Sequence, residues 1–152
     1  MKKFLKVAIP FGILLFLYFV PALLYKSDVN YYNSLNKPFF APPATLFGIA
    51  WPILYVLFSL YLAFKIADKT ITSEVIFYFV VNYVISFFFN KVFFLDKNLF
   101  LSFVVTFTSC ITGIFIFIST FKLGKNGFWF ILPYIIWTVY ASVLMANIYL
   151  TN

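Results

Sequence analysis

The chain has 152 residues, of which 64% are hydrophobic and only 10% charged, and its formal net charge is +7. Globular soluble domains contain roughly 45–50% apolar and about 25% charged residues, so this composition excludes a soluble domain. The 24 Phe, 11 Tyr and 3 Trp exclude a disordered chain. The apolar runs are also much longer than the alternating segments of ~10 residues that form an outer-membrane barrel, which argues against that class.

The charged residues narrow the chemistry further. All 11 basic residues are lysines, the acids are Asp28, Asp68, Glu74 and Asp96, and histidine is absent. His-ligated haem, His-containing zinc sites and Ser-His triads in their usual form are therefore excluded, and we expect no metal site and no catalytic residues. Cys110 is the only cysteine, so it cannot form an internal disulfide. Lysines beside apolar segments indicate membrane loops rather than nucleic-acid binding.

Five apolar segments, each near the ~20 residues that a spanning helix needs, follow one another along the chain. The first, about 7–25, follows Lys2, Lys3 and Lys6 and also looks like a signal peptide. It is longer than an h-region of ~7–15 residues and no small-x-small cleavage site follows, which favours a retained helix. The others cover about 45–66, 74–94, 99–121 and 128–150. We expect one domain over residues 1–152, an all-α integral membrane protein with a bundle of five transmembrane helices.

The connection between the first two spans, residues 26–44, is long for a compact bundle, and long connections are often functional lids. It contains Pro38, Pro42 and Pro43 together with four aromatic side chains, a composition that argues against a flexible linker. We predict an ordered loop on the mouth of the bundle, with Pro42 and Pro43 setting the chain rigidly into the second span. Lys37 in this loop is either a partner for an acidic ligand group or a solvated lysine.

Polar side chains are grouped on one face of the third span, where Asn82, Ser86 and Asn90 are spaced four residues apart. Because polar groups are unfavourable against lipid, we expect this face to point into the bundle. There it either contacts a ligand or forms hydrogen bonds to neighbouring helices. The fourth span carries a stripe of small residues, which favours close helix packing within or between protomers over ligand binding. The stripe consists of Ser102, Thr106, Ser109 and Gly113.

The distribution of lysines predicts the orientation. With five spans the chain ends lie on opposite faces, and the N-terminal face carries seven lysines against four on the other. The positive-inside rule then places the N-terminus in the cytoplasm and residues 26–44 outside. The seven are Lys2, Lys3, Lys6, Lys65, Lys69, Lys122 and Lys125, and the four are Lys26, Lys37, Lys91 and Lys97.

Residues 31–55, YYNSLNKPFFAPPATLFGIAWPILY, carry a family resemblance. Their pattern is similar to the signature of the TspO/MBR family, the translocator proteins or tryptophan-rich sensory proteins. The matching positions, in register and without gaps, are Tyr32, Leu35, Lys37, Pro38, Pro42, Pro43, Phe47, Trp51, Leu54 and Tyr55. A second block near the C-terminus resembles the family's ending, and it consists of Pro133, Tyr134, Trp137, Ala141, Leu144 and Asn152.

The chain departs from the family pattern at several positions. Phe40 replaces a family tryptophan, and Met145 stands where the family has asparagine. In the third span the best gapless register aligns Asn82 with a family glutamine, Ser86 with an asparagine and Phe89 with a tryptophan. A rival register, which needs compensating gaps, aligns the family asparagine with Asn82 or Asn90.

The resemblance implies an aromatic ligand pocket under the first loop. Family members bind porphyrins such as protoporphyrin IX, isoquinoline-carboxamide and benzodiazepine-type drugs, and in some cases sterols. Trp51 and Trp137, which by position alone fit an aromatic membrane belt, then more plausibly line the pocket, whereas Trp129 stays a belt residue. The site residues implied are Tyr32, Pro38, Phe40, Pro42, Pro43, Phe47, Trp51, Tyr55, Asn82, Ser86, Phe89, Trp137, Ala141, Leu144 and Met145.

Three functions remain open at this point. The favoured one is a membrane receptor or carrier that needs no cofactor, contacts membrane lipid, forms a homodimer in some settings and binds a porphyrin. The second is a light-dependent porphyrin-degrading enzyme with a nearby Trp or Tyr as electron donor, which the two family tryptophans replaced by Phe40 and Phe89 make less favourable. The third is a small transporter, for which no inward carboxylate is visible.

Overall fold

Long helices make up almost all of the protein. The structure, a computed structural model, describes residues 2–124 and 127–152, without the side chains of Lys2 and Lys3. The long helices are α1 (Lys2–Leu24), α3 (Ala44–Ala67), α4 (Ser73–Phe87), α5 (Leu99–Lys122) and α6 (Phe128–Thr151), and two short elements, α2 (Val29–Ser34) and η1 (Lys91–Leu95), accompany them. The described residues form no strand.

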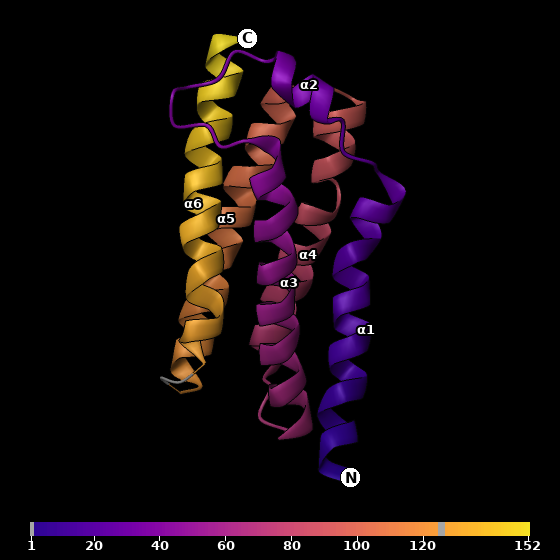
Figure 1. Ribbon diagram of the computed structural model, residues 1–152. Coiled ribbons are helices and arrows are strands. Elements are labelled where there is room, and N and C mark those ends of the chain that lie inside the picture. Colours follow the sequence, from indigo (N-terminus) through magenta and orange to yellow (C-terminus); the bar gives the residue numbers. More distant parts are fainter. Residues whose placement is uncertain (1, 125–126) are drawn as a thin grey trace.

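These helices agree with the five expected spans. Among the described residues five segments are long and apolar enough to cross a membrane, with α4 and η1 together forming the third. Figure 1 shows them standing side by side, with the N-terminus at one end of the bundle and the C-terminus at the other. Large apolar side chains such as Ile13, Phe16 and Leu23 are exposed on the outer surface, as expected of helices that face lipid.

The third span differs from the single helix that the sequence predicted. Instead of one helix over 74–94, α4 ends at Phe87 and the chain continues into the wider π-helical turn η1. In that turn the amide of Asp96 donates to the carbonyl of Lys91, five residues earlier. The change in winding keeps Val92 and Phe93 buried. An extended apolar run cannot reveal such a change, because either winding presents apolar side chains to its surroundings.

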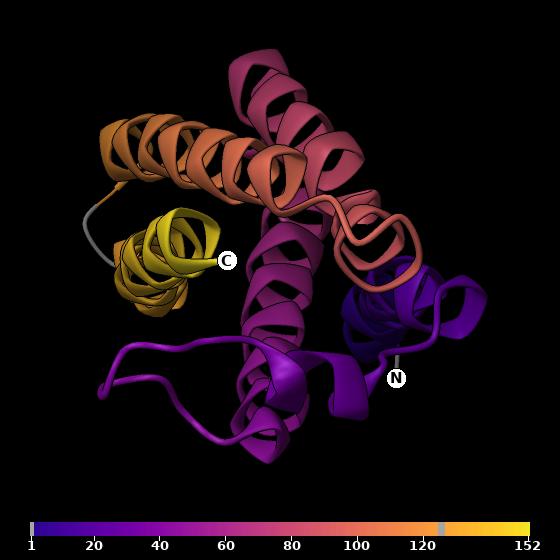
Figure 2. The ribbon, with the colours of Figure 1, turned by 90° about the horizontal axis from the view of Figure 1, so that it is seen from above.

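The helices are packed to different extents. α5 packs extensively on α6 and α4, and α1 on α3, whereas α1 meets α4 only briefly. Figure 2, viewed along the bundle, shows α3 in the centre with the loop crossing one side. The small-residue stripe of α5 faces inward, and a Cβ atom on Gly113 would lie only 2.9 Å from Cε1 of Tyr134 in α6. The stripe therefore serves packing within this chain.

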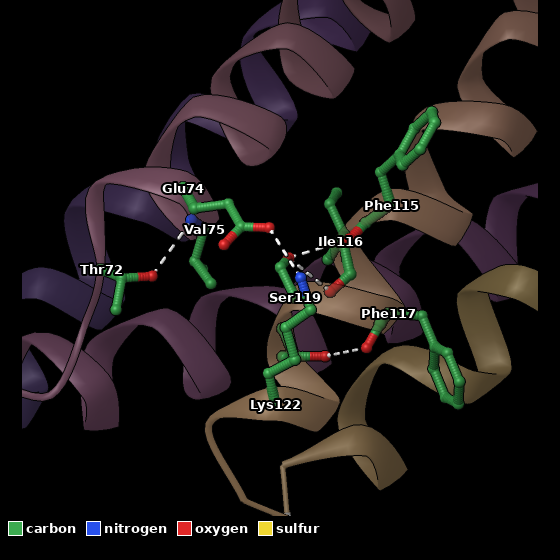
Figure 3. Close-up of polar contacts among 9 residues, drawn as sticks. Thr72, Glu74, Val75, Phe115, Ile116, Phe117, Ser119 and Lys122 are labelled. Carbon is green, nitrogen blue, oxygen red and sulfur yellow. Dashed lines mark hydrogen bonds and ion pairs between the residues drawn. The ribbon is translucent and has the colours of Figure 1, made fainter.

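Polar contacts join the helix ends near the N-terminal face (Figure 3). The Thr72 hydroxyl accepts a hydrogen bond from the amide of Val75 and so caps α4, and Nζ of Lys122 in α5 lies 3.4 Å from a carboxylate oxygen of Glu74 in α4. Both ion-pair partners are largely exposed, so this contact contributes little to stability. Lys125, one of the lysines used to predict the orientation, lies outside the described residues.

Candidate functional site

Trp51 of α3 and Trp137 of α6 lie edge to face, with ring centroids 6.4 Å apart and an interplanar angle of 88°. Phe47, one turn before Trp51, lies 5.8 Å from Trp137, and Tyr55, one turn after it, lies 5.9 Å from Trp51. Phe47 and Trp51 contact Trp137 of α6, and Tyr55 contacts Trp51 and, on its other side, Tyr18 of α1, so the structure brings together four aromatic residues that the sequence had singled out. We call these four residues the aromatic site.

A second cluster lies between the aromatic site and the loop. Its buried members among the expected site residues are Tyr32, Leu144 and Met145, and Phe40, Phe47 and Phe89 pack against it. Phe47 contacts both Tyr32 and Trp137, with centroid distances of 5.4 and 5.8 Å. The expected residues of the loop, α3 and the C-terminal half of α6 therefore form one continuous aromatic and apolar column. Ala141 is buried on α6 between Trp137 and Leu144 in sequence.

The loop over this column is ordered by hydrogen bonds, as expected. The hydroxyl of Tyr32 donates to the carbonyl of Pro42 at 2.8 Å, and that of Tyr140 donates to the carbonyl of Phe40 at 2.9 Å. The carbonyl of Pro38 accepts a hydrogen bond from the amide of Ala41, and Pro43 is the N-cap residue of α3. The carbonyls of Pro38 and Pro42 thus serve as acceptors within the loop, so the prolines act as structural parts of the cover.

Lys37 has a role that the sequence did not suggest. Its Nζ donates to the carbonyls of Tyr32, Asn33 and Leu35 at 2.8–3.0 Å, and it lies 4.9 Å from the Tyr32 ring centroid. The ammonium group therefore satisfies carbonyl groups at the C-terminal end of α2, where positive charge is favoured. It is neither a freely solvated lysine nor free to pair with a ligand carboxylate in this conformation.

A hollow lies beside the aromatic site, between α1, α3, α4 and α6. Its free volume of about 20 Å³ is enough for roughly one water molecule. Four expected site residues line it, namely Trp51, Tyr55, Asn82 and Ser86. The sequence reasoning missed the other lining residues, which are Tyr18, Pro21, Phe58, Tyr83, Phe87 and Tyr134. For Tyr18, Tyr83 and Tyr134 the sequence did contain a signal: each is a tyrosine within an apolar span, and a buried hydroxyl group needs a hydrogen-bond partner.

The polar face of α4 points into the bundle, as predicted, and its partners are neighbouring helices. The Asn82 side chain donates to the carbonyl of Ser109 at 3.0 Å and to the hydroxyl of Thr112 at 2.8 Å, and it accepts from the hydroxyl of Tyr134 at 2.9 Å. The Ser86 and Ser109 hydroxyls lie 3.1 Å apart. Of the two roles left open for these side chains, the structure shows the interhelical one.

The three tryptophans have different surroundings. Trp129 is 63% exposed on the outer surface of α6, which agrees with a membrane-belt residue. The indole Nε1 of Trp137 is buried and has no hydrogen-bond partner among the described residues. Buried donors are nearly always paired, so an unused indole N–H beside the aromatic site is available to an oxygen acceptor on a ligand.

The fold and the site together define a class: a helical protein with five candidate membrane spans and an aromatic site beneath an ordered loop. Comparison with known proteins agrees, because the pattern of the TspO/MBR family matches residues 7–150. The chain belongs to the TspO/MBR family.

Relatives from bacteria and an archaeon are similar over most of the chain. The tryptophan-rich protein TspO of Bacillus cereus is 30% identical over 90% of this chain and 90% of its own length. An uncharacterized membrane protein of Bacillus subtilis, YtaB, is 32% identical over 97% of both chains. The tryptophan-rich protein TspO of Archaeoglobus fulgidus is 32% identical over 84% of this chain and 83% of its own length. At this level of identity the relationship is distant, and the side chains of the site need their own argument.

Proposed function

We propose that this protein is a membrane receptor or carrier for a flat hydrophobic ligand, with a porphyrin such as protoporphyrin IX as the first candidate. The ligand binds at the aromatic site, Phe47, Trp51, Tyr55 and Trp137, beneath the loop. The protein lies in a bacterial cell membrane with its N-terminus in the cytoplasm. Sterols and isoquinoline- or benzodiazepine-type drugs are further candidates for the same site, and a homodimer is one candidate assembly.

The observation that carries this proposal is the Trp51–Trp137 pair. The two indoles come from different helices, α3 and α6, and their rings are nearly perpendicular. A planar ligand that inserts between them therefore gains a face-on contact with one ring and an edge contact with the other. The unpaired Nε1 of Trp137 adds a hydrogen-bond donor for a ligand oxygen. Sites for small molecules are typically lined by aromatic and apolar side chains with a small number of oriented polar groups.

The site as described has little free space. Its adjoining hollow has a free volume of about 20 Å³, whereas pockets that hold drug-sized ligands measure roughly 300–1,000 Å³. Binding of a porphyrin therefore requires a helix or the loop to move. This makes the expected binding slow compared with diffusion, because association then includes a conformational step.

A second function, light-dependent porphyrin breakdown, is favoured by one feature. Trp51 contacts Tyr55 at 5.9 Å and Tyr134 at 6.4 Å between ring centroids, so oxidisable side chains lie next to one another at the site. An excited porphyrin bound there would have electron donors in contact. The described residues present no acid–base constellation for dark catalysis at this position, where Tyr and Trp are the neighbours of the proposed ligand.

Titration of the purified protein in lipid nanodiscs with protoporphyrin IX tests both functions. In darkness we expect saturable quenching of tryptophan fluorescence and a shifted porphyrin absorption band, with empty nanodiscs as the control for partition into lipid. Absence of saturable binding would refute the receptor. Under illumination the band persists if the protein is a receptor, whereas protein-dependent loss of the band beyond that in empty nanodiscs would establish the enzyme.

A further inference from the structure

A proline in α1 leaves one carbonyl group without its helical partner. Pro21 lies inside α1 and has no N–H group, so the carbonyl of Leu17, four residues earlier, receives no hydrogen bond from within the helix. The hydroxyl of Tyr83 in α4 donates to this carbonyl at 3.0 Å. One side-chain hydrogen bond therefore satisfies the carbonyl that the proline exposes and also fastens α1 to α4.

The same residues border the hollow. Pro21 and Tyr83 line it together with Trp51, so the seam between α1 and α4 forms one wall of the hollow beside the aromatic site. The wall is thin, because α1 meets α4 only briefly and Tyr83 is partly exposed. The Tyr83 ring lies edge-on to Tyr18 at 5.5 Å, and Phe87 lies edge-on to Tyr25 at 6.1 Å.

Few polar contacts hold this seam. Besides the Tyr83–Leu17 bond, the seam has one further hydrogen bond among the described residues, a longer one of 3.3 Å. Nδ2 of Asn90, between α4 and η1, donates it to the carbonyl of Tyr25, the residue that follows α1. α1 itself is the least buried of the five long helices, with 6% of its apolar window buried. Separation of the C-terminal part of α1 from α4, with the chain bending in the turn between Leu17 and Pro21, breaks these two hydrogen bonds and the ring contacts of Tyr83 and Phe87. The rest of α1 stays packed on α3.

The loop end of the site is fastened more firmly. Asn36 of the loop and Asn152 exchange hydrogen bonds, with the Asn36 amide donating to Oδ1 of Asn152 at 2.9 Å and Nδ2 of Asn152 donating to the Asn36 carbonyl at 2.9 Å. These bonds add to those from Tyr32 and Tyr140 to loop carbonyls. Access through the loop therefore requires more hydrogen bonds to break than access through the seam.

We propose that aromatic ligands dissolved in the bilayer reach the site sideways, through the seam between α1 and α4, with the turn from Leu17 to Pro21 as the hinge and the Tyr83–Leu17 hydrogen bond as the gate. The inference rests on the proposed function and adds the route and the phase from which the ligand comes. It fits a ligand that partitions into lipid, because the exposed face of α1 beside the seam is apolar and lipid-facing.

Stopped-flow binding of protoporphyrin IX in nanodiscs tests the gate with a matched pair of variants. Tyr83→Phe keeps the ring and removes the bond across the seam, whereas Tyr140→Phe removes an equivalent bond from a tyrosine hydroxyl to a carbonyl at the loop. We expect Tyr83→Phe to raise the association and dissociation rates together by roughly two- to tenfold, with the equilibrium constant nearly unchanged. Tyr140→Phe should leave both rates unchanged. Acceleration by Tyr140→Phe alone, or unchanged rates in Tyr83→Phe, would overturn the proposal.

A second measurement needs no porphyrin. In a Trp129→Phe/Trp137→Phe background the remaining Trp51 lines the hollow, and a nitroxide dissolved in the lipid chains quenches its fluorescence more strongly when it passes the seam. Tyr83→Phe should increase this quenching by about twofold or more, and Tyr140→Phe should not. If protoporphyrin IX fails to bind the wild type, the proposed function fails, yet this quenching still decides on the seam. Equal quenching in all variants would refute the lateral route.

Discussion

The hydroxyl of Tyr32 donates a 2.8 Å hydrogen bond to the carbonyl of Pro42, ten residues further along the same loop. The Tyr32 ring packs edge-on against Phe47 of α3 at 5.4 Å, and only 4% of the residue is exposed. One side chain thus closes the loop on itself and fixes it to the helix that carries Trp51. The cover of the aromatic site therefore depends on the protonated form of this phenol.

This dependence predicts an effect of alkaline pH. Burial, followed by the nearby Tyr140, raises the pKa of Tyr32 to about 12. The folded state then binds more protons than the unfolded chain between the ordinary tyrosine pKa of ~10 and about 12, so the stabilisation from Tyr32 is complete below pH 10 and is lost as the pH rises through that window. Absorbance at 295 nm of the wild type minus that of Tyr32→Phe should show one tyrosine titrating near 12. Titration near 10 would contradict the buried hydrogen bond.

The spans could be predicted from the sequence because the signal was strong and physically simple. Apolar runs of about 20 residues leave the backbone no alternative to the helix in lipid, and α3, α5 and α6 begin and end within a residue or so of the expected positions. The π-helical η1 and the short α2 were not foreseen. Both depend on local hydrogen bonds that leave little trace in hydropathy. An example is the bond that the Asp28 carboxylate accepts from the amide of Tyr31 at the start of α2.

The site was predictable to the extent that it follows helix faces. Phe47, Trp51 and Tyr55 recur at a spacing of four residues on α3, and the family pattern of that spacing indicated a shared site with Trp137, which Phe47 and Trp51 contact. Contacts between α1 and α4 have no such periodicity. The pairing of Tyr83 with the Leu17 carbonyl arises from tertiary packing around Pro21. The sequence shows that Pro21 leaves a carbonyl without its helical donor, but it does not indicate which side chain donates instead.

Asn82 should be the most important polar residue for stability. Its amide forms hydrogen bonds to α5 and α6, and replacement by Ala leaves the Tyr134 hydroxyl without its acceptor. Hydrogen bonds between helices in membranes average ~0.6 kcal/mol, so Asn82→Ala should lower the free energy of unfolding by about 1–2 kcal/mol. Ser86→Ala, which removes one contact, should lower it by about 0.6 kcal/mol or less. Detergent-induced unfolding followed by tryptophan fluorescence measures both. Equal effects of the two variants would count against this network.

Gly113 is needed because of its neighbour on α6. A Cβ atom there would lie 2.9 Å from Cε1 of Tyr134, whose ring is buried, so Gly113→Ala should destabilise the bundle by about 1–3 kcal/mol through overpacking. Gly48 provides the control, since a Cβ atom at this exposed helical position meets nothing within 4 Å. Gly48→Ala should be neutral or stabilising by up to about 1 kcal/mol. The same unfolding assay compares the two, and a harmless Gly113→Ala would show that α5 and α6 pack more loosely than described.

The orientation can be tested at two exposed positions on opposite ends of the bundle. In a Cys110→Ala background, cysteine replaces Asn33 in the loop-end helix α2 or Thr70 between α3 and α4. If the N-terminus is cytoplasmic, an impermeant thiol reagent should label Asn33→Cys in intact cells and Thr70→Cys only after lysis. The reverse pattern would mean that the lysine bias has been interpreted with the wrong sign.

The tryptophan series locates the affinity for the ligand. Trp51 and Trp137 contribute large flat faces to one site, and Leu at either position keeps it apolar but removes the face. Aromatic contacts are worth ~0.5–1.5 kcal/mol beyond area burial, so affinity for protoporphyrin IX should fall by roughly three- to tenfold for each replacement. Trp129→Leu changes a residue that is 63% exposed on the outer surface, and it should leave affinity nearly unchanged. Ligand quenching of intrinsic fluorescence is an independent measurement, because most of it should disappear with Trp51 and Trp137 and little with Trp129. If Trp129→Leu weakens binding as much as the other two replacements, the ligand lies on the outer face of α6 rather than between α3 and α6.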